Sequence, residues 1–327
     1  MTGLLARWLR TLVRIVVAAG LTGYVLWKSH PRAVLAAAVE ADWRPMAIAL
    51  LLVFVDRSLM AYRWLVLLCT IKESERPPFA AVMRIFFVST FVGTFLPASV
   101  GGDAVRAYSL AKLKVGGGDA VASVFMDRML GLASVLLMAL VGLVLARDLA
   151  GNLTIVGSLG VAAAVVLVTL LLIFSQRATT TASALVTRLP VTLQRVGQPV
   201  LASVRRYAAY HGQLTNVLTC SIFVQVLRIT QAYYLGRGLG IEASLSTYFA
   251  FIPLILLVML LPVTFNGLGT SQAAFVWFFA RTGVSAAAAF ALSVLFVALG
   301  VVGNLPGGVL YAFGRGGEAQ DPRPRRG

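Results

Sequence analysis

The sequence predicts an all-α integral membrane protein with about six full transmembrane helices plus two opposed re-entrant helical hairpins in an inverted-repeat arrangement. Composition is the first reason: of 327 residues, 59% are hydrophobic and only 12% charged, and the mean hydropathy is +0.88. Such values lie far outside those of soluble globular domains. The second reason is that apolar stretches of spanning length recur along the chain. The third is a pair of glycine-rich breaks, each of which follows a Leu-Pro pair.

Six apolar stretches are each about 20 residues or longer, which is enough to cross a hydrocarbon core of ~30 Å. They are 12–28, 45–67, 119–146, 152–174, 214–236 and 286–313. We expect residues 1–314 to form one polytopic membrane domain, because no polar block of domain length interrupts these stretches.

Two further apolar units, about 79–114 and 246–281, are broken near their middle. In each unit an apolar segment ends at a proline, Pro97 or Pro262, and a glycine-rich break and a short helical segment follow. A half-membrane helix needs only about 10 residues, so each unit fits either a re-entrant hairpin or a pair of full crossings. Hairpins that enter from opposite sides predict inverted repeats, which are typical of transport proteins.

Basic residues predict the orientation. The chain has 28 Lys and Arg against 12 Asp and Glu, a net charge of +16. These cations gather beside apolar spans, which is typical of cytoplasmic loops, so we expect no nucleic-acid partner. Both termini are predicted to be cytoplasmic, as is the amphipathic 176–212 connection, which we expect to form interfacial helices broken at Pro190 and Pro199. Residues 315–327 are predicted to be a disordered basic tail. The 28–44 loop opposes this orientation, because it would lie outside and yet carries basic residues.

Ionisable residues inside membrane spans are costly and are therefore candidates for function. Those in the predicted spans include Asp56, Arg57, Arg63, Asp127, Arg128 and Arg228. Each adjacent Asp-Arg pair is either an internal ion pair that holds the helices together or part of a binding site. The set favours a binding site, because Arg57, Arg106, Arg128 and Arg228 outnumber the aspartates at 56, 103 and 127. An arginine left unpaired at depth needs a substrate anion or water.

The breaks are predicted to expose helix N-termini at the starts of the segments 103–114 and 270–281. Asp103 is expected to cap the first helix after Gly101-Gly102, and Thr270 or Ser271 to cap the second after Gly267-x-Gly269. Free N–H groups at such a terminus bind anions, and glycine lets a phosphate approach closely. The alternative is that these glycines only permit a tight turn. Because Asp103 would repel an anion, we expect it to pair with Arg106 or to handle a proton.

Catalytic motifs are missing from the sequence. It contains no DxD, GxSxG, HExxH or P-loop pattern, and its two histidines lie far apart. Cys69 and Cys220 are isolated in apolar segments, which predicts neither a disulfide nor a metal site. We therefore expect no enzymatic activity, no cofactor and no metal. Without an ATP site, any transport would run downhill or use an ion gradient.

Three motifs together resemble a known family. They are Phe95-Leu-Pro-Ala-Ser-Val-Gly-Gly-Asp-Ala-Val-Arg106, Asp127-Arg-x-x-Gly131 and Leu261-Pro-x-x-x-Asn-Gly-Leu-Gly-Thr270. The chain is similar to the lysylphosphatidylglycerol synthase transmembrane region, a flippase-like family, without the soluble aminoacyltransferase domain of its larger members. The candidate substrate-binding residues are Arg57, Arg63, Pro97, Gly101, Gly102, Asp103, Arg106, Asp127, Arg128, Arg228, Asn266, Gly267, Gly269, Thr270 and Gln272.

The resemblance implies a multi-pass protein of a bacterial or archaeal cytoplasmic membrane that moves an anionic or phosphate-bearing lipid, or a lipid-linked molecule, between leaflets. Membrane lipids are the implied partners, with possible proton coupling through Asp103 or Asp127. A departure is Gln272, where relatives often carry Glu. Two alternatives remain: a membrane transferase that acts on a lipid-linked sugar, and a membrane anchor for a separate lipid-synthesising enzyme. The sequence does not indicate the substrate or the oligomeric state.

Overall fold

The computed structural model describes residues 41–95, 100–113, 115–145, 153–188, 190–259 and 269–313, and within these ranges all the regular structure is helical. The first predicted span and the predicted basic tail lie outside them. The helices are α3 (Trp43–Leu67), α4 (Phe79–Phe95), α5 (Val100–Ala111), α6 (Gly117–Leu145), α7 (Leu153–Phe174), α8 (Gln176–Val186), α9 (Val191–Arg206), α10 (His211–Gly238), α11 (Leu245–Met259), α12 (Thr270–Phe279), α13 (Ala286–Val302) and α14 (Leu305–Phe313).

Membrane-spanning length is found in several of these helices. Among the described residues, Trp43–Thr70, Gly117–Leu145 and Ala286–Ala312 are long and apolar enough to cross a bilayer, and the bent pair α7 and α8 adds a fourth candidate if it is one span. Helix α10 has 28 residues, but it carries more polar side chains and is not among these candidates. The apolar helices make this a membrane-embedded protein, and the predicted number of six full spans stays a prediction.

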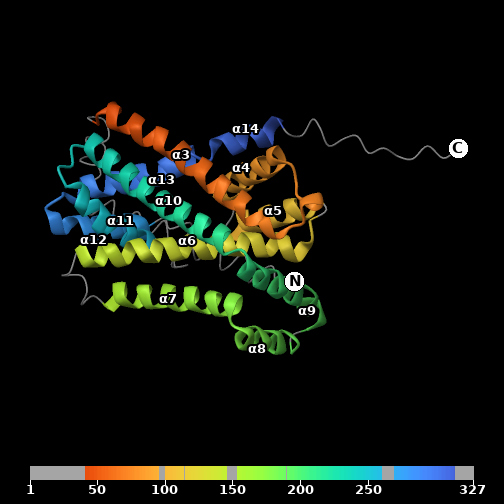
Figure 1. Cartoon of the computed structure of the whole chain (residues 1–327). Coiled ribbons are helices and arrows are strands. Elements are labelled where there is room, and N and C mark those ends of the chain that lie inside the picture. The colour runs from red at the N-terminus through yellow and green to blue at the C-terminus, as the bar shows by residue number, and fades with distance from the viewer. Residues whose placement is uncertain are drawn as a thin grey trace, which may run out of the picture.

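The long helices α3 and α10 lie side by side and run in opposite directions (Figure 1). At one end the Asp42 N–H donates to the Gly238 carbonyl over 2.8 Å. At the other end the Tyr207 hydroxyl, just before α10, donates to the Leu67 carbonyl over 2.7 Å. Burial raises the pKa of Tyr207, so this hydroxyl stays protonated as a donor. These two contacts join α10 to α3 at both of its ends.

Helices also pack closely where glycines allow their backbones to approach, as is common in membrane bundles. A Cβ atom added to Gly93 of α4 would lie 2.9 Å from the Cα of Gly102 on α5. One added to Gly142 of α6 would lie 2.5 Å from the Ala250 carbonyl oxygen on α11, and one on Gly307 of α14 would lie 2.0 Å from the Phe87 carbonyl oxygen on α4. Helix α6 thus packs on α11, and α14 packs on α4.

The close contact between α14 and α4 makes a testable prediction. We expect Gly307→Ala to lower the free energy of unfolding by about 1–3 kcal/mol, because the new methyl group overlaps a backbone oxygen that cannot move without shifting α4. Gly160→Ala in α7 is the control, since a Cβ there meets nothing within 4 Å and alanine favours a helix. Thermal unfolding of the detergent-solubilised protein measures both. Equal unfolding midpoints for the two variants would contradict this packing.

The 176–212 connection forms α8 and α9, which lie with α7 on one side of α6 (Figure 1). The predicted break at Pro190 is confirmed, since Pro190 is the N-cap of α9. The predicted break at Pro199 is wrong, because Pro199 lies inside α9. Its side chain packs against the start of α6, where a Cβ on Gly118 would lie 2.8 Å away. Packing against α6 therefore stabilises α9 at a position where proline removes a helix hydrogen bond.

Candidate functional site

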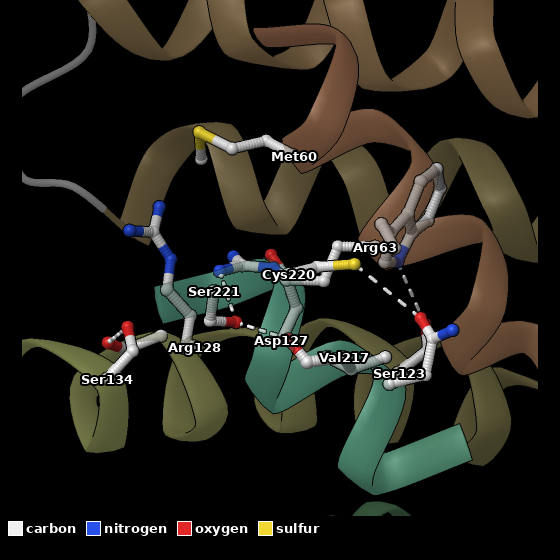
Figure 2. A network of polar contacts seen from close by, with 12 residues as sticks. Met60, Arg63, Ser123, Asp127, Arg128, Ser134, Val217, Cys220 and Ser221 are labelled. Atoms are coloured by element: carbon white, nitrogen blue, oxygen red, sulfur yellow. Dashed lines mark hydrogen bonds and ion pairs between the residues drawn. The ribbon is translucent and has the colours of Figure 1, made fainter. Parts of the chain in front are cut away.

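Two arginines and one aspartate from three different helices form a buried group that we call the central cluster: Arg63 of α3, Arg106 of α5 and Asp127 of α6. Arg63 Nε donates to Asp127 Oδ1 over 2.7 Å, and Arg106 Nη1 lies 3.2 Å from Asp127 Oδ2. All three side chains are almost completely buried. Figure 2 shows Arg63 and Asp127 pointing toward each other. Each carboxylate oxygen therefore has its own guanidinium partner.

Neutral groups complete the surroundings of the central cluster. Ser221 of α10 accepts a hydrogen bond from Arg63 Nη1 over 2.9 Å, and Ser89 of α4 accepts one from Arg106 Nε over 3.4 Å. The Arg106 guanidinium also lies over the ring of Phe86, 4.6 Å from its centre. A Cβ on Gly131 would lie 3.6 Å from the Arg63 guanidinium, an ordinary contact distance, so the glycine of the Asp127-Arg-x-x-Gly131 motif lies beside this side chain.

A second ion pair joins Asp103 of α5 to Arg128 of α6. Arg128 donates to both carboxylate oxygens, over 2.6 Å from Nε and 3.0 Å from Nη2. The Arg128 side chain is 48% exposed and that of Asp103 is 15% exposed. Figure 2 shows Arg128 extending away from Asp127, on the side where Met60 lies. This pair is therefore the accessible edge of the central cluster.

The pairing differs from the one that the sequence predicts. The adjacent residues Asp127 and Arg128 do not pair with each other: Asp127 binds Arg63 and Arg106, and Arg128 binds Asp103. The expected pair of Asp103 with Arg106 is also wrong, because Asp103 binds Arg128 and Arg106 binds Asp127. Neighbours in a helix point about 100° apart, so one of them faces the interior while the other faces the edge.

A third group lies nearer the middle of α3 and consists of Asp56 and Arg57 of α3 with Arg228 of α10; we call it the mid-helix cluster. Arg57 Nη1 lies 3.1 Å from Asp56 Oδ2, and Arg228 Nε of α10 lies 3.5 Å from Asp56 Oδ1. The expected ion pair between neighbours is thus present at Asp56-Arg57, but a residue from a distant part of the chain shares the same carboxylate.

The first predicted helix N-terminus is displaced. Helix α5 begins at Val100, so Gly101, Gly102 and Asp103 lie within its first turn. Asp103 is therefore not the expected N-cap, and its carboxylate turns to Arg128 instead. The role that the structure gives Gly102 is close packing against Gly93 of α4. Pro97 lies outside the described residues.

The second helix N-terminus is close to its predicted position, but its cap differs. Helix α12 begins at Thr270 after Gly269, whose φ of +86° favours glycine. The cap is made by Gln272, whose Oε1 accepts from the Gly269 N–H over 2.6 Å and from the Ser271 hydroxyl over 3.0 Å. Thr270 and Ser271 therefore do not act as the expected N-caps. Asn266 and Gly267 lie outside the described residues.

The charges of these groups do not balance. Five arginines (57, 63, 106, 128 and 228) share three aspartates (56, 103 and 127), which leaves two positive charges in excess. In a low-dielectric interior an uncompensated charge is costly, so the arrangement suits an anionic ligand. Over the described part of the chain, no group of three or more His, Cys, Asp or Glu side chains is placed to hold a metal ion.

The structure adds residues that the sequence analysis missed. Ser89 and Ser221 bind the arginines of the central cluster, and Met60 contacts two arginines of the mid-helix cluster. One signal was present in the sequence: Ser221, Gln225 and Arg228 follow at helical spacing and so share one face of α10. Isolated serines such as Ser89 carry no such signal.

A family model described as Lysylphosphatidylglycerol synthase TM region matches residues 11–307 of the chain, which includes all the groups described above. A comparison with curated proteins finds no match.

Proposed function

The chain belongs to the lysylphosphatidylglycerol synthase TM region family, and we propose that it is a translocase that moves an anionic, phosphate-bearing lipid or lipid-linked molecule between the leaflets of a bacterial or archaeal cytoplasmic membrane. The observation that carries the proposal is the surplus of two positive charges among buried and half-buried side chains of apolar helices. A charged side chain inside a membrane costs about 3 kcal/mol or more unless it finds a partner. A lipid phosphate supplies that partner.

Arg128 is the proposed first contact for the phosphate. Its side chain is half-exposed, and both oxygens of its present partner, Asp103, are bound in the fork geometry that a phosphate also adopts. An incoming phosphate replaces Asp103 as the partner of the Arg128 guanidinium. Asp103 is then released next to the site, which makes it the better candidate for handling a proton. Asp127 is the weaker candidate, because two buried arginines hold it.

Inverted repeats fit the order of the helices. Helices α3, α4, α5 and α6 have 25, 17, 12 and 29 residues, and α10, α11 and α12 have 28, 15 and 10, followed by the 27-residue stretch Ala286–Ala312. Both halves thus run long, short, short, long. The antiparallel contact of α3 with α10 and the reciprocal contacts of α6 with α11 and of α14 with α4 support an exchange of elements between the halves.

Re-entrant hairpins are our proposal for α4–α5 and α11–α12. The members of each pair have 10 to 17 residues, which is short of the roughly 20 that cross a bilayer. Gly93 and Gly102 bring α4 and α5 into close contact next to the break between them, as a hairpin requires.

A cytoplasmic position is proposed for the end of the bundle that carries α8 and α9. The end of α3, the start of α6 and the start of α10 meet there, through Tyr207 with Leu67 and Pro199 with Gly118. Basic residues gather at this end, and cytoplasmic loops of membrane proteins are rich in Lys and Arg. The basic residues at this end of the bundle are Lys72, Arg76, Arg177, Arg188, Arg195, Arg205 and Arg206. The termini would then be cytoplasmic, and the phosphate would reach Arg128 from the cytoplasmic leaflet.

Reconstitution into sealed proteoliposomes tests the function. Headgroup-labelled phosphatidylglycerol, an aminoacylated phospholipid and a glycolipid are each incorporated, and loss of the signal protected in the inner leaflet is followed with and without a pH gradient. We expect the protein to speed the exchange of at least one phosphate-bearing lipid above the rate of protein-free liposomes. A rate equal to that of empty liposomes for every lipid, under both conditions, would contradict the proposal.

A further inference from the structure

The central cluster and the mid-helix cluster lie along one pair of opposed helix faces. Asp56, Met60 and Arg63 follow at spacings of four and three residues, so they share one face of α3. The facing side of α10 carries Ser221 against Arg63 and Arg228 against Asp56. Arg63 follows Asp56 by seven positions, which places the clusters about 10 Å apart along the helix axis.

The guanidinium groups of the mid-helix cluster are poorly satisfied. The single carboxylate of Asp56, which is almost completely buried, serves both Arg57 and Arg228. Beyond it, both arginines point a donor at the thioether of Met60, with N···S distances of 3.4 Å from Arg57 and 3.3 Å from Arg228. A thioether is a weak acceptor, so it replaces little of the hydration that a guanidinium loses on burial.

The two arginines of this cluster differ in how firmly they are held. Arg57 also donates to the Gly300 carbonyl at the end of α13 over 3.2 Å, and a Cβ on Gly303 would lie 3.3 Å from its Nε. That buried Nε has no hydrogen-bond partner among the described residues. Within the part of the chain that the structure describes, the polar contacts of Arg228 are the 3.5 Å contact to Asp56 and the one to the Met60 sulfur, and its side chain is 25% exposed. Arg57 is therefore fixed, and Arg228 is the accessible cation with the weaker partners.

We propose that the mid-helix cluster is a second phosphate-binding position, in which Arg228 and Arg57 bind the phosphate of the lipid after it leaves the central cluster. This inference rests on the proposed translocase function. Phosphate oxygens would take the place of the Met60 sulfur as acceptors, which converts weak contacts into charge-assisted hydrogen bonds. Two positions about 10 Å apart let the charge cross in steps, because a path with several moderate sites releases its ligand more readily than one deep site.

Arg228→Gln tests the second position, with Arg237→Gln as the matched control. Arg237 lies on the same helix and is exposed near its end, away from both clusters. Two quantities are measured for each variant: equilibrium binding of headgroup-labelled phosphatidylglycerol to the purified protein in detergent, and movement of the same lipid in sealed proteoliposomes. Unfolding midpoints show that the variants are folded, and Arg228→Lys replaces Arg228→Gln if the latter is not.

The expected results separate this inference from the function itself. For Arg228→Gln we expect binding to stay within about twofold of the wild type, since sites this far apart act independently, while movement slows by about 10-fold or more, the scale of one lost charge-assisted hydrogen bond. Movement at the wild-type rate overturns the second position and leaves the translocase standing. Parallel loss of binding and movement overturns it as well, because that result indicates a single site. A wild-type protein that moves none of the lipids tested overturns the function and, with it, this inference.

Discussion

Asp127→Asn is expected to lower the free energy of unfolding by about 3–5 kcal/mol, which removes much of the stability of a typical protein. Among the residues that the structure describes, Asp127 is the one carboxylate that forms an ion pair with Arg63 and with Arg106. Its neutralisation leaves two buried guanidinium groups facing each other across an amide. We expect a low yield of folded protein and a large fall in the midpoint of thermal unfolding in detergent.

Asp103→Asn is the control for that prediction. It also removes an aspartate from an arginine, but the partner, Arg128, is half-exposed, so water compensates for most of the loss. We expect a change of about 1 kcal/mol or less, as is typical of exposed ion pairs. Similar unfolding midpoints for the two variants would show that burial does not distinguish these two aspartates and would contradict the structure of the central cluster.

Arg128→Gln is expected to slow lipid movement by about 10- to 100-fold, because it removes the proposed first contact with the phosphate, and a hydrogen bond to a charged group is worth about 1.5–3 kcal/mol. Stability should fall less than for Asp127→Asn, since Arg128 is half-exposed and water reaches the partner that it leaves. The proteoliposome assay measures movement, and thermal unfolding measures stability. Arg281→Gln is the matched control: it removes an exposed arginine that stacks on the Trp277 ring and donates to the Trp277 carbonyl over 2.7 Å, away from the three charged groups, and we expect it to move lipid at the wild-type rate.

A double variant shows whether Arg128 acts on the lipid or only holds Asp103. Asp103→Asn with Arg128→Gln removes the ion pair and leaves neither charge unpaired. If Arg128 binds the phosphate, the double variant stays as slow as Arg128→Gln. Recovery of wild-type movement in the double variant would contradict the proposed contact and indicate that the unpaired Asp103 had blocked transport.

The sequence was sufficient for the fold class and the family. A membrane-embedded helical protein follows from apolar stretches that no soluble core could bury, and the match to the family model over residues 11–307 confirms the resemblance that the three motifs carry. The separate short helices α4 with α5 and α11 with α12 were also predictable, because proline lacks the N–H that a helix interior needs and glycine favours non-helical backbone. Helix ends were less so: α5 starts at Val100, before the glycines, since packing against α4 favours helix there.

For the charged residues, too, the sequence determined one part and the tertiary structure the other. The sequence determined that more arginines than aspartates lie within apolar segments, because residue type and hydropathy are local properties. It did not determine which charges meet, since Asp127 finds its partners 64 and 21 residues away and Asp56 shares its carboxylate with a residue of α10. Those partners depend on how α3, α5, α6 and α10 are rotated and shifted against one another. Helix rotation and register are set by side-chain packing across the bundle, and for that reason only the tertiary structure decided that Asp127 is buried between two arginines while its neighbour Arg128 lies at the accessible edge.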